Sequence, residues 1–248
     1  MVSHDNIDIL LITETWLTES DTYESREICP EDYQFLRCDR SHGKGGGVGF
    51  LLRNSFNALV IETSQYSSFE HFALRIASDR EIIRLIVVYR PCKSLPLFMD
   101  EFTCLLEELA LGGYSVLISG DFNIHFNNKK STHTTQFTKL CDAFDMVQNV
   151  TEATHIKGHT MDFILNRSCD KLKVNNVRVL DLISDHHLVC CELSIDKPAI
   201  SKRNITYRNL KTIDVECFRK DILEFELTQN YMDLNLNDLT ESYDDQLQ

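Results

Sequence analysis

The first half of the chain alternates between short apolar segments and polar turns, a pattern that predicts strands. Each segment is rich in β-branched or aromatic residues and is bounded by Gly, Asn, Ser or Asp. The predicted strands up to Tyr89 are Ile7–Thr13, Gly47–Arg53, Ala58–Glu62, Phe69–Ala77 and Glu81–Tyr89.

From Phe98 onward, the spacing of apolar residues changes in two places to three and four, which is typical of amphipathic helices. The predicted helices are Phe98–Leu111, which ends at two glycines, and Thr134–Phe144. Further strands are predicted at Val116–Ser119, Met161–Leu165, Val174–Leu180 and His187–Ser194. A few helices among many strands favour a mixed α/β sandwich over a regular βαβ alternation.

The sequence changes character near Asp196. Lys197-Pro198 marks a break, and the remainder as far as Gln248 is polar and acidic. We therefore expect one domain over residues 1–195 and a weakly helical linker or tail over residues 196–248.

Composition narrows the functional classes. The formal net charge of −13 disfavours tight non-specific binding to DNA, although carboxylates that hold a divalent cation reverse the sign of the charge locally. The nine cysteines are scattered and never spaced as C-x-x-C, which predicts reduced, mostly core thiols in an intracellular protein of the nucleus or cytoplasm. No apolar run has the length of a membrane span, so no membrane association is expected.

Four clusters of acidic or amide residues lie at the ends of predicted strands. They are Glu14, Gly120-Asp121-Phe122-Asn123, Asp162, and Ser184-Asp185-His186-His187. A buried carboxylate is costly unless it binds something, and open sheets bind ligands at their strand ends. Glu14, Asp121 and Asp185 offer the oxygen ligands that Mg²⁺ prefers, while Asp162 and His186 are expected to form a carboxylate–imidazole pair.

Each signal also has a structural interpretation. A single Asp after a strand is commonly a turn or a helix cap, and Tyr89 taken alone is more typical of core packing. The glycine run Gly43–Gly49 lacks the spacing of a phosphate-binding loop and predicts a tight turn. His155 and His159 lack a cysteine pair, which disfavours zinc, and Trp16 is expected to pack beneath the site.

Taken together, the motifs resemble the endonuclease/exonuclease/phosphatase superfamily, which includes DNase I and the exonuclease III-type AP endonucleases. Its motifs appear here as Leu11–Leu17, Gly45–Phe50, Val88–Pro91, Gly120–Asn123, Thr160–Phe163 and Ser184–His187. Within the superfamily, Glu14-Thr15-Trp16, Gly120–His125 and Ala153–Asp162 most resemble endonucleases of non-LTR retrotransposons. The resemblance implies a DNase I-like four-layer α/β sandwich of two mixed sheets flanked by helices.

The resemblance also implies roles for individual residues. Glu14 is expected to be the principal metal ligand, with Asp185 beside the metal and Asp121 orienting or deprotonating the attacking water. Asn123 is expected to hold that water and the phosphate, and Tyr89 to touch the scissile phosphate. His186, paired with Asp162, is expected to stabilise the phosphorane.

The implied activity is that of a Mg²⁺-dependent endonuclease, with Mn²⁺ as the alternative ion. The expected substrate is double-stranded DNA, nicked to leave a 3′-hydroxyl, and the expected partner is a reverse transcriptase domain of the parent element. The family's first strand carries an Asn of the metal site, and only thirteen residues precede Glu14, so we expect that first core strand to be missing. A catalytically impaired remnant that acts as a binding module is therefore the alternative, and a phosphomonoesterase or phosphoinositide phosphatase is a less favoured one.

Overall fold

The computed structural model describes residues 6–41, 43–77, 81–91, 95–195, 214–224 and residue 237. By its internal contacts the chain divides into two compact units, Met1–Pro198 and Ala199–Gln248. The first unit carries all the residues that sequence analysis singled out for chemistry.

A six-stranded mixed sheet forms the centre of the first unit, with the strand order β4-β5-β6-β7-β9-β8. β6 and β7 run parallel, and the other neighbouring pairs are antiparallel. Its strands are β4 (Ala58–Ile61), β5 (Glu70–Ala77), β6 (Ile82–Tyr89), β7 (Ser115–Asp121), β8 (Met146–Gln148) and β9 (Asp162–Arg167).

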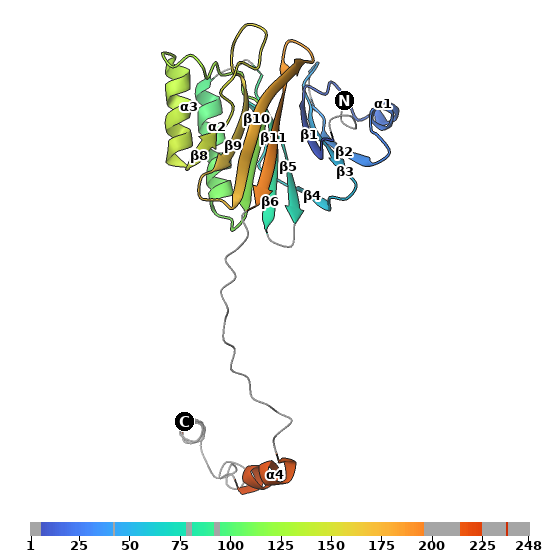
Figure 1. The fold of residues 1–248 in the computed structure, drawn as a ribbon, viewed down its shortest axis with the longest axis vertical. Helices are drawn as coiled ribbons and strands as arrows, with labels where there is room; N and C mark the ends of the chain where they lie inside the picture. The colour runs from blue at the N-terminus through green and yellow to red at the C-terminus, as the bar shows by residue number, and fades with distance from the viewer. Residues whose placement is uncertain are drawn as a thin grey trace. The chain divides into compact units, whose positions relative to one another are not determined.

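Two helices, α2 (Leu95–Ala110) and α3 (Thr132–Ala143), cover one face of this sheet (Figure 1). Their apolar side chains, with Phe98 and Phe102 of α2 and Phe137 of α3 fully buried, pack against alternate residues of the central strands. Burial of aromatic and aliphatic side chains of this size is the main stabilising term for such a layer.

The opposite face packs against a second layer of strands. This layer consists of an antiparallel three-stranded sheet with the order β1-β3-β2 and an antiparallel pair, β10-β11. Its strands are β1 (Ile9–Thr13), β2 (Tyr33–Cys38), β3 (Val48–Arg53), β10 (Leu172–Leu182) and β11 (His187–Ile195). Within the described part of the chain, β1 pairs with β3 alone, so its other edge carries no ladder.

The second unit contains α4 (Val215–Glu224), which begins where the Asp214 carboxylate accepts hydrogen bonds from the backbone amides of Glu216 and Cys217. This is the normal way to satisfy the first free amides of a helix. In the described residues, no helix is both long and apolar enough to cross a bilayer.

The expected α/β sandwich is confirmed, and every predicted strand and helix has a counterpart. The second layer differs from the expectation, because its described strands pair only in antiparallel fashion and form two sheets. Sequence analysis missed α1 (Thr22–Glu27), β2 and β8. The expectation of mostly core thiols is wrong: among the eight cysteines in the described residues, Cys141 alone is buried.

Candidate active site

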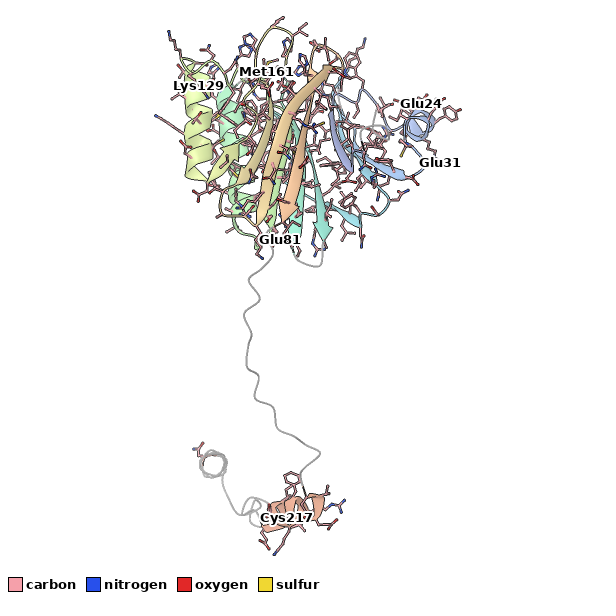
Figure 2. All side chains as sticks on the ribbon, in the orientation of Figure 1. Glu24, Glu31, Glu81, Lys129, Met161 and Cys217 are labelled. Atoms are coloured by element: carbon pink, nitrogen blue, oxygen red, sulfur yellow. The ribbon has the colours of Figure 1, made fainter. Side chains whose placement is uncertain are left out.

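Three polar residues form a row across the central sheet. Tyr89 at the end of β6 pairs in register with Asp121 at the end of β7, which pairs with Asp162 at the start of β9. Residues in register on neighbouring strands point to the same face of a sheet. Tyr89 belongs to the core between the two strand layers, so the row faces the second layer. Met161, next to Asp162, marks this end of the sheet, and Glu81 lies at the opposite end (Figure 2).

Asp121 is the buried carboxylate of the row, with 6% of its surface exposed. Burial first, and then the neighbouring Asp162, raise the pKa of Asp121 to about 7. Asn123 holds it in place: its backbone amide donates to Oδ1 at 2.9 Å and its side-chain amide donates to Oδ2 at 2.9 Å. The carboxylate is thus fixed in position and able to exchange a proton near neutral pH.

A glycine permits the close approach of β7 to β6 just before Asp121. Gly120 has a φ of +145°, and a Cβ at that position would lie 1.9 Å from the carbonyl oxygen of Val88. Arg90, which follows Tyr89, also braces this turn by donating from Nη1 to the carbonyl oxygens of Phe122 and Asn123 at 3.1 Å each. Sequence analysis did not single out Arg90, although the motif Val88-Tyr89-Arg90-Pro91 contains it.

His186 enters the row from the loop before β11. Its Nδ1 lies 2.8 Å from Oδ2 of Asp162, so the ring donates to that carboxylate through Nδ1 and keeps Nε2 for another partner. The hydrogen bond to Asp162, supported by the charges of Asp162 and Asp121, raises the pKa of His186 to about 9. The expected pairing of Asp162 with His186 is therefore present, and the ring is an imidazolium at neutral pH.

Glu14 reaches the site from the end of β1. Its carboxylate accepts hydrogen bonds from the Tyr89 hydroxyl and, at 3.1 Å, from Nε1 of Trp16. Burial, and then the contact with Glu14, raise the pKa of Tyr89, which keeps the hydroxyl a donor. The negative charge of Glu14 also helps to raise the pKa of Asp121, so the two carboxylates are close enough to interact electrostatically.

The glycine run supports the segment Glu14–Trp16. Gly46 and Gly47 accept backbone hydrogen bonds from Trp16 at 2.8 Å and Thr15 at 3.2 Å. Gly45, Gly46 and Gly47 all have φ between +76° and +84°, a region that favours glycine. The predicted tight turn is present, and it shapes the loop beside Glu14. The expectation that Trp16 packs beneath the site is wrong, because the residue is 57% exposed.

Asp185 lies on the far side of His186, where sequence analysis missed a neighbour. His155 is buried, and its Nε2 lies 3.5 Å from Oδ2 of Asp185. The backbone amide of Lys157 donates to Nδ1 of His155 at 3.1 Å, so the neutral ring carries its proton on Nε2 and turns it toward Asp185. A hydrogen bond to its own backbone, followed by the charges of His186 and His155, lowers the pKa of Asp185.

The donor set suits a divalent cation. Two groups of three residues could each hold a cation, because the donor atoms within each group lie within 4.8 Å of one another. The groups are Asp121–Asp162–His186 and His155–Asp185–His186, and neither includes Glu14. The predicted trio of Glu14, Asp121 and Asp185 therefore does not form one tight group; His186 stands between Asp121 and Asp185. A cation would offset the repulsion that raises the pKa of Asp121, and oxygen donors favour Mg²⁺ or Mn²⁺.

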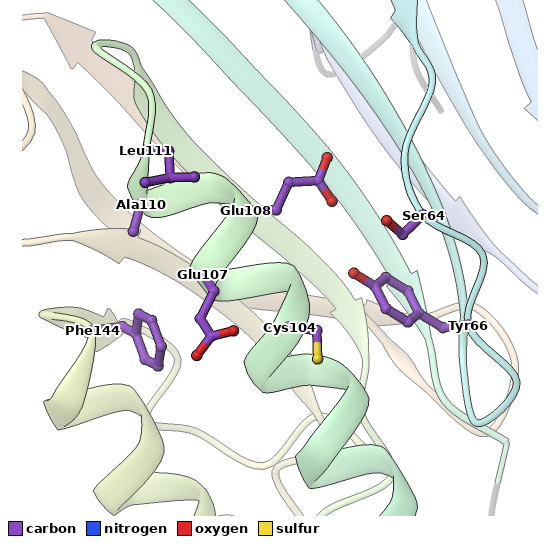
Figure 3. Close-up of a pocket in the computed structure, with 8 residues that line it drawn as sticks. All are labelled: Ser64, Tyr66, Cys104, Glu107, Glu108, Ala110, Leu111 and Phe144. Carbon is purple, nitrogen blue, oxygen red and sulfur yellow. The ribbon is translucent and has the colours of Figure 1, made fainter.

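A separate hollow of about 620 Å³ lies beside the C-terminal half of α2 (Figure 3). It shares no residue with the row of polar side chains. Glu107 and Glu108 line it together with apolar groups, so it would repel a phosphate-bearing ligand. The strand-end site is the better candidate for chemistry on phosphates.

Residues 83–190 match the family model described as endonuclease-reverse transcriptase. No curated protein matches the sequence.

Three solved structures illustrate the fold. The endonuclease domain of TRAS1, a telomere-specific non-LTR retrotransposon, is 12% identical with a TM-score of 0.58, over 75% of this chain and 85% of that one. D. rerio TDP2 complexed with single-strand DNA product is 12% identical with a TM-score of 0.58, over 78% and 88%. The mannosyl-6-phosphatase Bt3783 of Bacteroides thetaiotaomicron is 15% identical with a TM-score of 0.59, over 79% and 88%.

At identities this low, the similarity shows the fold alone. An endonuclease and a phosphatase share this fold, so it does not identify the substrate. The family match covers the segment that holds Tyr89, Asp121, Asp162 and His186. The chain therefore has the DNase I-like fold of these structures, and residues 83–190 match the endonuclease-reverse transcriptase family model.

Proposed function

We propose that this protein is a Mg²⁺-dependent endonuclease that nicks double-stranded DNA and leaves a 3′-hydroxyl. The observation that supports the proposal most strongly is the register row of Tyr89, Asp121 and Asp162, joined by His186 on one side and Glu14 on the other. A buried carboxylate (Asp121), an imidazolium (His186) and a further carboxylate (Glu14) meet at the strand ends, and phosphodiester hydrolysis requires groups of these kinds.

Asp121 acts as the base. With its pKa near 7, it takes a proton from the water that attacks phosphorus, and Asn123 keeps the carboxylate aimed at that water. A bond forms between the water oxygen and phosphorus while the bond from phosphorus to the 3′ oxygen breaks. The leaving oxygen takes a proton from solvent, so the products are a 3′-hydroxyl and a 5′-phosphate.

His186 stabilises the charge that develops on the phosphate oxygens. Asp162 fixes the ring through Nδ1 and keeps it protonated, so that Nε2–H faces the transition state. The Tyr89 hydroxyl is a second donor that can turn from Glu14 toward the phosphate.

Glu14 would be the principal ligand of the Mg²⁺, or of Mn²⁺ in its place; Asp121 and Asp185, which do not form one tight group with Glu14, would act on the ion through bound water. When bound, the ion would neutralise phosphate charge and polarise the scissile bond. Glu14 is kept in position by the hydrogen bonds from Tyr89 and Trp16.

A nick with a free 3′-hydroxyl is a primer for DNA synthesis, so a reverse transcriptase is the proposed functional partner. The description of the matching family as endonuclease-reverse transcriptase supports this partner. Residues 196–248 are proposed to serve as the linker.

The test is conversion of supercoiled plasmid to open circles by the full chain with Mg²⁺, followed by extension with a DNA polymerase that needs a 3′-hydroxyl. We expect Mg²⁺-dependent nicks that the polymerase extends, and their loss in Asp121→Asn. Asp142→Asn, which removes an exposed carboxylate from α3, is the matched control and should nick normally.

Other outcomes separate the alternatives. Release of inorganic phosphate from a 3′-phosphorylated oligonucleotide without nicking would indicate a phosphomonoesterase. Binding of DNA by the folded chain without either activity would indicate the impaired binding module.

A further inference from the structure

Trp16 is an exposed aromatic residue directly beside the site. It is 57% exposed, yet its indole Nε1 donates to the carboxylate of Glu14 at 3.1 Å. The polar edge of the ring thus points toward the proposed cation site, while much of the ring remains open to solvent. Single exposed apolar residues are common on protein surfaces, so exposure alone carries no function.

The ring is held in place, which distinguishes it from an ordinary surface side chain. The Trp16 backbone has a φ of +57°, a conformation that costs on the order of 1 kcal/mol or more outside glycine, and its amide donates to the Gly46 carbonyl at 2.8 Å. A Cβ on Gly45 would lie 3.3 Å from the indole, so this glycine lets the ring rest against the loop. Strain retained at an exposed position indicates that the position of the ring matters.

The ammonium group of Lys44 lies near the ring. Nζ of Lys44 lies 5.9 Å from the centre of the indole, within the range of a cation–π contact. An aromatic face next to a lysine is the usual composition of a base-stacking subsite, in which the lysine neutralises a phosphate and the ring stacks on a base.

We infer that Trp16 is a stacking subsite for an unpaired or unstacked nucleic-acid base next to the cleaved phosphate. The base of the nucleotide adjoining that phosphate is attached to it through one sugar, and Trp16 is two residues from Glu14, so both lie within reach. Gly45 packs against the ring, and the base stacks on the part of the ring that remains exposed. The inference deepens the proposed function, and it predicts a preference for DNA that is locally distorted or unpaired at the cleavage site.

The chain offers a direct probe, because Trp16 is its only tryptophan. The measurement is tryptophan emission of the full-length Asp121→Asn variant, which should bind without cutting, titrated with two short duplexes. One duplex carries a single unpaired adenine, and the other carries a reduced abasic residue in its place. Fluorescence anisotropy of labelled copies gives the dissociation constants independently.

We expect the adenine duplex to quench the emission and the abasic duplex to bind more weakly with little quenching. Adding Trp16→Ala should weaken binding of the adenine duplex about 5- to 100-fold, the range for loss of one base–aromatic stack, and leave binding of the abasic duplex unchanged. Trp16→Phe, which retains a ring, should recover most of the affinity. Tyr23→Ala removes another exposed aromatic residue, at 71% exposure, and should change neither duplex.

Equal binding of both duplexes without a base-dependent change in emission would overturn the inference and leave the nuclease proposal intact. Failure of the Asp121→Asn chain to bind either duplex would contradict the DNA substrate itself, and the subsite with it. The emission experiment uses no substitution at Trp16, so its result does not depend on whether Trp16→Ala folds.

Discussion

The site has two halves that are built in different ways. Asp121 is buried at the end of a central strand, and its environment alone moves its pKa to about 7. Glu14 is exposed at the end of β1, a strand whose five residues are all only partly buried. Hydrogen bonds from Tyr89 and Trp16, not burial, orient Glu14. Burial thus sets the pKa of Asp121 in one half of the site, whereas hydrogen bonds position the Glu14 carboxylate in the other half.

The largest expected effect on catalysis follows from removing the ionisable carboxyl group of Asp121. Asp121→Asn keeps the shape of the side chain and removes its ability to take a proton. We expect the rate of plasmid nicking to fall about 10²- to 10⁴-fold, the usual range for a general base. Nicking by Asp121→Asn at the wild-type rate would contradict the assignment.

The same substitution tests the burial argument through stability without added metal. Because the pKa of folded Asp121 is raised from 3.8 to about 7, the folded protein retains a proton in that window, and above pH 7 the buried charge destabilises it. Asp121→Asn should therefore raise the free energy of unfolding at pH 8 by about 1–2 kcal/mol, and by less near pH 4. Glu14→Gln, at an exposed position, should change it by less than about 0.5 kcal/mol. Equal effects in denaturant melts would break the comparison.

A second prediction concerns the pH dependence of catalysis. Asp162 keeps the pKa of His186 near 9, so the wild-type rate should fall as the pH rises through about 9. In Asp162→Asn the pKa of His186 should return toward about 6.5, which moves the alkaline limb of the kcat/KM profile to lower pH. At pH 8 we expect a loss of about 10- to 100-fold. An unmoved limb in Asp162→Asn would show that His186 does not set it.

A third and smaller effect is expected at His155. His155→Phe removes the Nε2–H that faces Asp185, and losing a hydrogen-bond donor to a carboxylate that helps to hold a metal costs about 10- to 100-fold in metal affinity or activity. His155→Gln retains an N–H donor and should lose less. The measurement is the Mg²⁺ concentration for half-maximal nicking, with thermal melts to check folding. An identical Mg²⁺ dependence in all three proteins would rule out positioning of Asp185 by His155.

A last effect lies away from the site, in the same central sheet. Burial lowers the pKa of His71 on β5 from 6.5 to about 4, so the unfolded chain binds a proton that the folded protein does not. Stability should therefore be lost as the pH falls from about 6.5 toward 4, by about 2 kcal/mol from this residue. His71→Gln should flatten that part of the stability curve relative to wild type. Parallel curves for the two proteins would contradict the burial of a neutral ring.

The sequence was sufficient for the strands with strong apolar patterns and for the helices with three-four spacing. It missed β2 because Gln34 and Arg37 interrupt the apolar pattern of this edge strand, and Arg37 is tied locally to Asp39 by an ion pair. It missed β8 because three residues are too few for a periodic signal. Such elements depend on neighbours that only the folded chain brings together.

The site could be predicted as a set of strand-end residues, but its internal arrangement could not. The pairing of Asp162 with His186 followed from residue types, whereas the contact between Tyr89 and Glu14 depends on how two layers pack. His155 gave only a weak signal, because its role depends on the backbone amide of Lys157 fixing the tautomer. Trp16 was misjudged because apolar character predicts burial, and here the glycine run holds the ring outward.

The central claim is that Asp121 directs water onto the phosphorus of a DNA phosphodiester, with the 3′ oxygen leaving. The most direct measurement is plasmid nicking with Mg²⁺ in water enriched in heavy oxygen, followed by mass spectrometry of the strand ends. We predict the heavy atom in the new 5′-phosphate, an unlabelled 3′-hydroxyl, and formation of this labelled product by Asp121→Asn about 10²- to 10⁴-fold more slowly. A labelled 5′-hydroxyl or a 3′-phosphate end, or labelling by Asp121→Asn at the wild-type rate, would contradict these assignments.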